Sequence, residues 1–222
     1  MAVQTGEHPF ARAVRHRGGV ALDPPAGSVE APVESAAFAA VLVRGDDILP
    51  PVARLDPLLA AAWLVLAAGP AAGAREAAVA SGLATRVGGD GPPAYLVTAG
   101  RVGGSADPRS QPIEPGLVAR VLDAAAEGAV DWEDDPDFGY ELPMDLPGLE
   151  VAERRVLVPR FLFARTDRVY DYAAMVPARQ RERAARLAAV PGLGAAIARA
   201  PGIGLPERRP PAPPARRRYL PS

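Results

Sequence analysis

The chain contains no cysteine, no lysine and no asparagine, and only 5% of its 222 residues are aromatic. Without cysteine it has no disulfide, no thiolate zinc site and no cysteine nucleophile. Without lysine it has no G-x-x-x-x-G-K-[ST] loop, the motif that cradles phosphates in many nucleotide-binding proteins. Every basic side chain except two histidines is an arginine. These absences exclude several classes of enzyme before any motif is considered.

Long apolar runs and a strong net charge are also missing. The most apolar run, residues 58–68, spans about eleven residues, well short of the roughly 20 that cross a bilayer. Residues 1–19 mix acidic and basic side chains without an apolar centre, so we expect no secretory signal. The formal net charge is −1, which favours neither nucleic acid nor a membrane surface as a partner. A cytoplasmic location is the resulting expectation.

The residues that are present are enough for one domain with tails. Apolar residues make up 49% of the chain, which suffices for a hydrophobic core. Residues 1–35 lack a clear period and predict a poorly ordered lead-in. Residues 36–150 predict an α/β domain with a mixed sheet and flanking helices, and 151–200 an arginine-rich helical extension. The proline- and arginine-rich residues 201–222 predict a disordered tail.

Apolar runs bounded by turn residues predict the strands. Residues 36–43 and 94–98 are expected to be buried strands. Residues 138–142 predict a third short strand that ends at Pro143. Residues 156–163 predict either an edge strand or an extended arm.

Helical spacing and end signals predict four helices, over 57–68, 71–83, 115–128 and 170–189. Asp56 is placed to cap the first, and Pro57 fits its first position. Gly69-Pro70 ends that helix. Its face of Leu58, Leu59, Ala62, Trp63 and Leu66 should pack on the sheet. Pro177 either kinks the last helix or starts its second part.

Two loops are candidates for ligand binding. The strand at 94–98 runs into Gly100, Gly103 and Gly104, and ligands usually sit at a glycine loop placed between a strand and a helix. On their own, such glycines are a weak signal and favour a plain turn. Carboxylates gathered over residues 131–137 suit a divalent cation. They match no EF-hand pattern and have no nearby histidine, which favours a solvated loop, so we expect no metal site.

Three blocks of sequence carry a resemblance to a known family. They are residues 38–43 with 48–55, residues 95–104, and residues 135–143 with Pro147-Gly148. In this order and spacing they resemble the C-terminal part of ATP-dependent phosphoenolpyruvate carboxykinase. The matched features are a strand followed by a Leu-Pro-Pro-Val step, a strand ending in a glycine loop, and an acidic pattern after the next helix. The resemblance implies a truncated, degenerate family member containing part of the nucleotide-binding subdomain.

The family converts oxaloacetate and ATP into phosphoenolpyruvate for gluconeogenesis. This chemistry needs a phosphate loop, a lysine and two metal ions around the transferred phosphoryl group. The resemblance alone implies ATP with Mg²⁺ or Mn²⁺ as cofactors. Since the 222 residues contain neither that loop nor any lysine, we expect no catalytic residue and no activity from this chain alone. Gly45-Asp46-Asp47 superficially resembles the family's acidic metal pair, but it precedes Leu49-Pro-Pro51 and matches a later strand end.

The resemblance also implies a residual nucleotide site. The family has an arginine and an isoleucine after the glycine loop, and a threonine in the following helix. Ile113 matches the isoleucine, whereas Pro112 and Val118 stand where the arginine and threonine belong. Arg109 is the candidate substitute for the arginine. The residual nucleotide-binding residues are therefore Gly103, Gly104, Arg109 and Ile113.

Two functions follow from these observations. The first is that of a phosphoenolpyruvate carboxykinase-family protein, as the resemblance implies. The second is a non-catalytic interaction or regulatory module, or a partner subunit, derived from that family. A trimmed sheet would expose edges and apolar faces, and such surfaces tend to acquire a partner. We therefore expect a homo-oligomer, or a separate chain that supplies the missing half.

Overall fold

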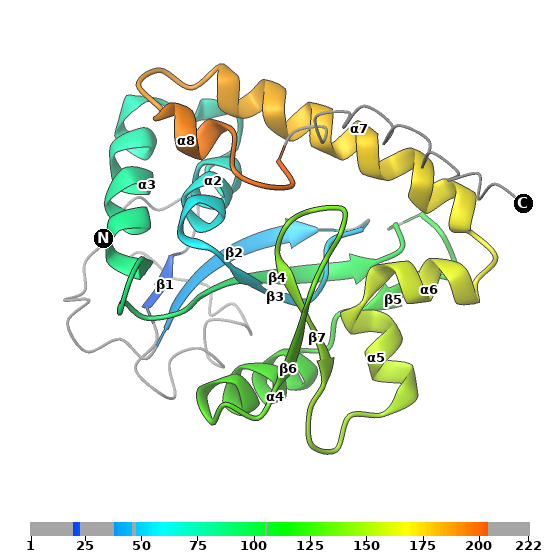
Figure 1. Cartoon of the computed structure of the whole chain (residues 1–222). Helices are drawn as coiled ribbons and strands as arrows, with labels where there is room; N and C mark the ends of the chain where they lie inside the picture. The colour runs from blue at the N-terminus through cyan, green and yellow to red at the C-terminus, as the bar shows by residue number, and fades with distance from the viewer. Residues whose placement is uncertain (1–19, 23–37, 46–47, 105, 204–222) are drawn as a thin grey trace, which may run out of the picture.

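A mixed β-sheet flanked by helices forms the centre of the molecule (Figure 1). The computed structural model describes residues 20–22, 38–45, 48–104 and 106–203. Within them the sheet has the strand order β1-β2-β4-β3-β7-β6, with β5 paired to β4. The strands are β1 (Val20–Leu22), β2 (Ala39–Gly45), β3 (Val52–Leu55), β4 (Ala94–Val102), β5 (Gln111–Pro112), β6 (Asp131–Asp134) and β7 (Glu141–Asp145). The expected mixed α/β architecture is confirmed.

Parallel and antiparallel pairing divide the sheet into two halves. β1, β2 and β4 are parallel, whereas β3, β7 and β6 add antiparallel strands. β2 and β4 are largely buried, because they lie inside the sheet between covering helices. At the junction of β3 and β7, Arg54 lies opposite Glu141 and forms an ion pair with it. The same guanidinium lies 5.2 Å from the centre of the Trp132 ring.

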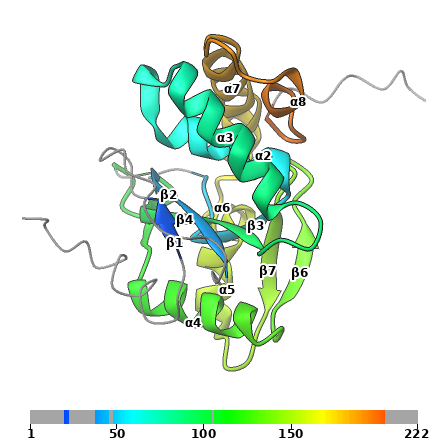
Figure 2. The same ribbon diagram turned by 90° about the vertical axis from the view of Figure 1, so that its left-hand side faces the viewer.

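Helices cover both faces of the sheet, as the two views show (Figures 1 and 2). On one side lie α2 (Pro57–Ala67), α3 (Ala74–Val87), α7 (Val169–Ala188) and α8 (Ala195–Ala198). On the other lie α4 (Pro115–Ala126) and α5 (Val151–Leu157), and α6 (Pro159–Arg165) lies beside β5. The short 3-10 helix η2 (Gly69–Ala71) directly follows α2 in the chain. The described faces of the sheet are therefore not the bare apolar surfaces expected of a trimmed domain.

The first helix begins where the sequence predicts. Asp56 is the residue before α2, and its Oδ1 accepts a hydrogen bond from Leu59 N at 2.8 Å. Pro57 occupies the first helical position, where its missing N–H costs nothing. Trp63 is 5% exposed and lies in the core. Of the predicted packing face, only Leu58 is exposed, at 36%.

The hairpin of β6 and β7 departs from the expectations. Residues 131–137 were predicted to be a solvated loop, but Asp131–Asp134 form the edge strand β6. The third strand was predicted over 138–142, yet it runs over Glu141–Asp145 and contains Pro143. Proline is tolerated there because β7 pairs with β3 only at Glu141, so Pro143 has β6 alone as a neighbour.

Residues 156–163 are helical rather than an edge strand or an extended arm. α5 ends at Leu157 and α6 begins at Pro159. A short apolar run does not by itself distinguish a strand from a buried helix. Two local features favour helices here. Glu153 accepts a hydrogen bond from Glu150 N at 3.0 Å at the start of α5, and Pro159 occupies the first position of α6.

The two ends of the chain differ in part from the expectations. Val20–Leu22, inside the expected poorly ordered lead-in, form β1 and pair with β2. Ile203, inside the expected tail, is 1% exposed. The remainder of both segments, residues 1–19, 23–37 and 204–222, lies outside the described residues.

Candidate functional site

The glycine loop after β4 begins where two strands approach closely. Gly100 has φ +115°, and a Cβ on it would lie 2.3 Å from the carbonyl oxygen of Gly45. Any side chain at position 100 would therefore collide with the end of β2. The pairing of β2 with β4 ends at these two glycines, and β4 continues to Val102. The loop that follows lies next to α6 and α7 (Figure 1).

Three arginines fasten this loop to the rest of the fold. Arg101 donates from Nε to Ser110 Oγ at 2.7 Å and from an Nη to the Ser110 carbonyl at 2.8 Å. Arg168, at the start of α7, donates to the Gly103 carbonyl at 2.7 Å and lies 3.2 Å from an Asp107 carboxylate oxygen. We name this set of contacts the loop clasp.

Arg109 completes the loop clasp. Its guanidinium donates to the Asp107 carboxylate at 3.0 and 2.9 Å and to the Thr166 carbonyl at 3.1 Å. Hydrogen bonds from Arg109 hold the pKa of Asp107 at about 2, below its ordinary value. The Asp107 carboxylate is thus charged at neutral pH and bridges Arg109 and Arg168.

The four residues predicted to bind a nucleotide lie in two different settings. Gly103, Gly104 and Arg109 belong to the same loop, and both glycines have positive φ. Ile113, by contrast, is only 5% exposed and belongs to the hydrophobic core. Its backbone N–H donates to the Gly100 carbonyl at 3.0 Å. The loop therefore holds three of the four residues, and its cationic member is engaged with Asp107.

A second candidate site lies where β2 ends against α2 and α7. A cavity of about 620 Å³ is lined by residues of these three elements and of η2. Four arginines line it: Arg44 from β2 and Arg179, Arg183 and Arg186 from α7. Glu182 is the one carboxylate among the lining residues that the structure describes. We name this cavity the arginine cavity.

Two of these arginines are held in place by the fold. Arg183 is 6% exposed, and its guanidinium lies 4.6 Å from the Trp63 ring centre and 4.5 Å from that of Phe138. Such cation–π stacking suits a buried guanidinium. Arg186 donates to the carbonyl of Leu66, in the last turn of α2, at 2.6 Å. A cation at a helix C-terminus interacts favourably with the helix dipole.

Sequence reasoning missed the arginine cavity, although part of its signal was present. Arg179, Arg183 and Arg186 are spaced four and three residues apart, which places them on one face of a helix. Nothing local in the sequence shows that this face meets the ends of β2 and α2. The juxtaposition depends on how α7 folds back over the sheet.

The described residues of the two candidate sites do not include the carboxylates of a metal centre. Among the described residues, no group of three or more His, Cys, Asp or Glu side chains is placed to hold a metal ion. Asp46 and Asp47, which directly follow the cavity-lining residues Arg44 and Gly45 in the sequence, lie outside the described residues. The loop clasp also does not fit a triphosphate, since its arginines bond to the loop's own carbonyls and to Asp107.

No protein-family model matches the chain, and no curated protein matches it either. No helix in the described part of the chain is long and apolar enough to cross a membrane.

Proposed function

We propose that this chain is a non-catalytic binding module related to the C-terminal part of ATP-dependent phosphoenolpyruvate carboxykinase. The sequence blocks that carry the resemblance fall on β2 with β3, on β4 with its glycine loop, and on the turn before β7 with β7 itself. These strands are consecutive neighbours in the order β2-β4-β3-β7. Blocks that are separate in sequence but adjacent in one sheet support a common structural unit.

The observation that carries the non-catalytic part is the loop clasp. A loop that supports phosphoryl transfer presents backbone N–H groups and cations to the phosphates and their metal ions. In this loop, Arg101, Arg109 and Arg168 bond to Ser110, Asp107 and Gly103 instead. The 222 residues also contain no lysine to balance the charge of a transferred group. The loop is therefore proposed to fasten β4 to α6 and α7 rather than to act on a nucleotide.

An activity assay tests this proposal. The purified chain is incubated with oxaloacetate, ATP and Mg²⁺ or Mn²⁺, and phosphoenolpyruvate and ADP are measured. We expect neither product above the protein-free control, because the groups that stabilise the transition state are absent from the chain. Turnover by the natural sequence that disappears in Arg109→Gln would contradict the proposal and support a residual nucleotide site at Gly103, Gly104, Arg109 and Ile113.

The partner-subunit alternative has less support from the geometry. Helices cover both described faces of the sheet (Figure 2), and the edge strand β6 carries exposed carboxylates at Asp131, Glu133 and Asp134. Charged side chains on an edge strand oppose pairing with another chain. A homo-oligomer, or a complex with a separate chain, stays a prediction that sedimentation of the purified protein measures directly.

A further inference from the structure

The arginine cavity gathers positive charge from two elements of the fold. The described residues that line it include four arginines and one glutamate, so within this set positive charges exceed negative ones by three. We propose that the arginine cavity binds a small polyanion through phosphate or carboxylate groups. This proposal rests on the proposed function in one respect, that the chain binds its ligand without converting it.

The arginines reach the cavity from two directions. Arg44 is exposed and comes from the end of β2, whereas Arg179, Arg183 and Arg186 come from one face of α7. Guanidinium groups from two different elements suit a ligand with more than one anionic group, since each anion accepts hydrogen bonds from a different element. Planar guanidinium forks match both phosphate and carboxylate oxygens.

The fold preorganises this charge. The guanidinium of Arg183 makes cation–π contacts with Trp63 and Phe138, and Arg186 is anchored on the Leu66 carbonyl. The contact of Arg186 with Leu66 engages one of the five N–H donors of its guanidinium. Anchoring before binding reduces the conformational entropy that the ligand must offset.

Size and wall chemistry narrow the class of ligand. The volume of about 620 Å³ lies in the usual range for small-molecule sites. Apolar side chains, among them Val43, Leu49 and Leu66, line the cavity beside the arginines. This combination fits a compact molecule with two or three anionic groups on a short skeleton. It does not resemble an extended basic surface of the kind that tracks a nucleic-acid backbone.

Calorimetric titration of the full chain with inorganic pyrophosphate and, separately, with citrate tests the proposal. Pyrophosphate stands for a phosphate ligand and citrate for a carboxylate ligand. We expect saturable one-to-one binding of at least one probe with a Kd below about 1 mM, weakening as the salt concentration rises. Binding of pyrophosphate alone assigns the cavity to phosphates, and binding of citrate alone assigns it to carboxylates.

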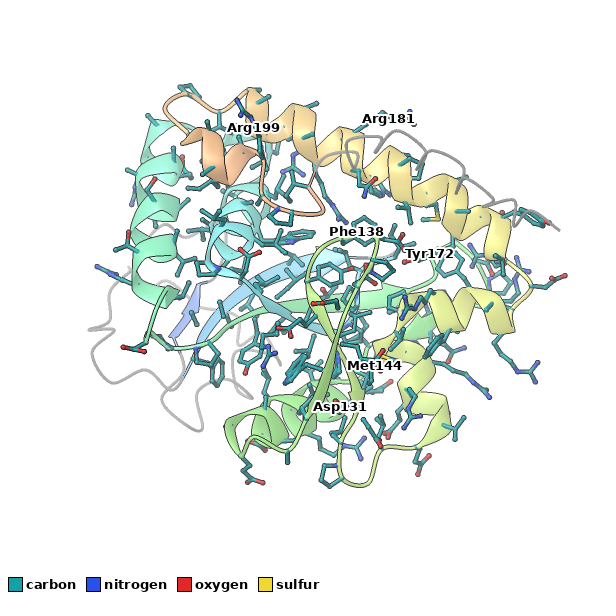
Figure 3. The ribbon with its side chains drawn as sticks, in the orientation of Figure 1. Asp131, Phe138, Met144, Tyr172, Arg181 and Arg199 are labelled. Atoms are coloured by element: carbon teal, nitrogen blue, oxygen red, sulfur yellow. The ribbon has the colours of Figure 1, made fainter. Side chains whose placement is uncertain are left out.

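Substitutions locate the binding. Arg44→Gln removes an exposed guanidinium at the cavity and should raise the Kd about tenfold, the usual effect of losing a charged hydrogen bond. Arg181→Gln is the matched control, because Arg181 is an exposed arginine of α7 outside the cavity lining and is labelled in Figure 3. It should leave the Kd unchanged. Arg186→Gln should weaken binding as well, measured only after circular dichroism shows that it folds.

Two results would overturn the proposal. One is the absence of saturable binding for both probes up to about 10 mM, far above the Kd expected of a built site. The other is binding that Arg44→Gln and Arg181→Gln weaken equally, which would place the anion on the general surface charge. Neither result depends on catalysis, so the binding and activity experiments fail independently.

Discussion

A single side-chain oxygen fixes the start of α2. Asp56 Oδ1 accepts the hydrogen bond from Leu59 N, which satisfies one of the backbone N–H groups that a helix start leaves without an intrahelical partner. Asp56→Ala removes this acceptor, and we expect the free energy of unfolding to fall by about 1 kcal/mol. Urea unfolding followed by far-ultraviolet circular dichroism measures the loss.

The control comes from the start of α4. Glu114 occupies the equivalent position there but makes no side-chain hydrogen bond to the helix backbone. Glu114→Ala should therefore change the free energy of unfolding much less than Asp56→Ala. Equal losses would show that the helix dipole, and not the capping hydrogen bond, makes the contribution of Asp56.

At the scale of single residues, the sequence predicts local features well. The Asp56 cap and the position of Pro57 depend only on neighbours within one helical turn, and both are confirmed. The role of Arg109 depends on Asp107, two residues away, and on the Thr166 carbonyl, which is remote in sequence. A pattern search finds Arg109 as a cation near a glycine loop, but not the carboxylate that engages it.

Among the elements, the β6–β7 turn is built around a buried carboxylate. Asp135 is 4% exposed, and its Oδ1 accepts hydrogen bonds from the N–H groups of Asp137 and Phe138 at 2.9 and 2.8 Å. Burial raises the pKa of Asp135 above its ordinary value. Ionisation of Asp135 at neutral pH therefore lowers the free energy of unfolding.

The sign of the pH dependence follows from this raised pKa. The folded protein binds the Asp135 proton more tightly than the unfolded chain does, so this group's contribution to stability falls as the pH rises above about 4, the pKa in the unfolded chain. Asp135→Asn keeps the acceptor oxygen and cannot titrate. Relative to the natural protein, we expect it to gain stability with rising pH until the folded-state pKa is passed, as measured by urea unfolding at several pH values.

Asp135→Ala serves as the control because it removes both the charge and the acceptor. It should be less stable than Asp135→Asn by about 2 kcal/mol at every pH, since buried N–H groups lose their partner. A difference between the natural protein and Asp135→Asn that stays constant over the whole pH range would contradict the assigned role of Asp135.

Element types were harder to predict where tertiary contacts decide them. Phe138 and Tyr140 are buried and apolar, so they resemble part of a strand, but they lie in the turn that Asp135 organises. Figure 3 shows Phe138 and Tyr172 projecting into the space between this turn and α7, where the Tyr172 hydroxyl donates to Asp137 at 3.0 Å. The apolar residues 156–163 were equally ambiguous, and the caps of α5 and α6 decide for helix.

For the whole molecule, strands β2 and β4 and helices α2, α3, α4 and α7 followed from sequence patterns, whereas the packing of α7 and α8 did not. The arginine cavity exists because α7 lies across the ends of β2 and α2, a contact between residues more than a hundred positions apart, such as Arg186 with Leu66. Periodicity in the sequence indicates which face of a helix is apolar or charged, but not which distant element that face contacts.

The last described residues are part of this long-range packing. Ile197, Ala200 and Ile203 are 5%, 2% and 1% exposed and belong to the hydrophobic core, and α8 contacts α2. Gly202 approaches the β6–β7 turn so closely that a Cβ on it would lie 1.9 Å from the Phe138 carbonyl carbon. The segment that begins at residue 190 therefore joins the helical layer to the hairpin.

Removing this segment tests whether it belongs to the cooperative unit. A chain ending at residue 189 exposes the sites that the two isoleucines and the alanine cover, and should lose roughly 5 kcal/mol of unfolding free energy. Since small domains have about 5–15 kcal/mol in total, this loss is about a third of the total or more, and we expect circular dichroism to show a markedly lower urea midpoint for this chain. A chain ending at residue 203 keeps every described residue and is the reference for this comparison. Identical unfolding midpoints and m values for both truncations would instead make residues 190–203 an independent appendage, because the surface exposed on unfolding sets m.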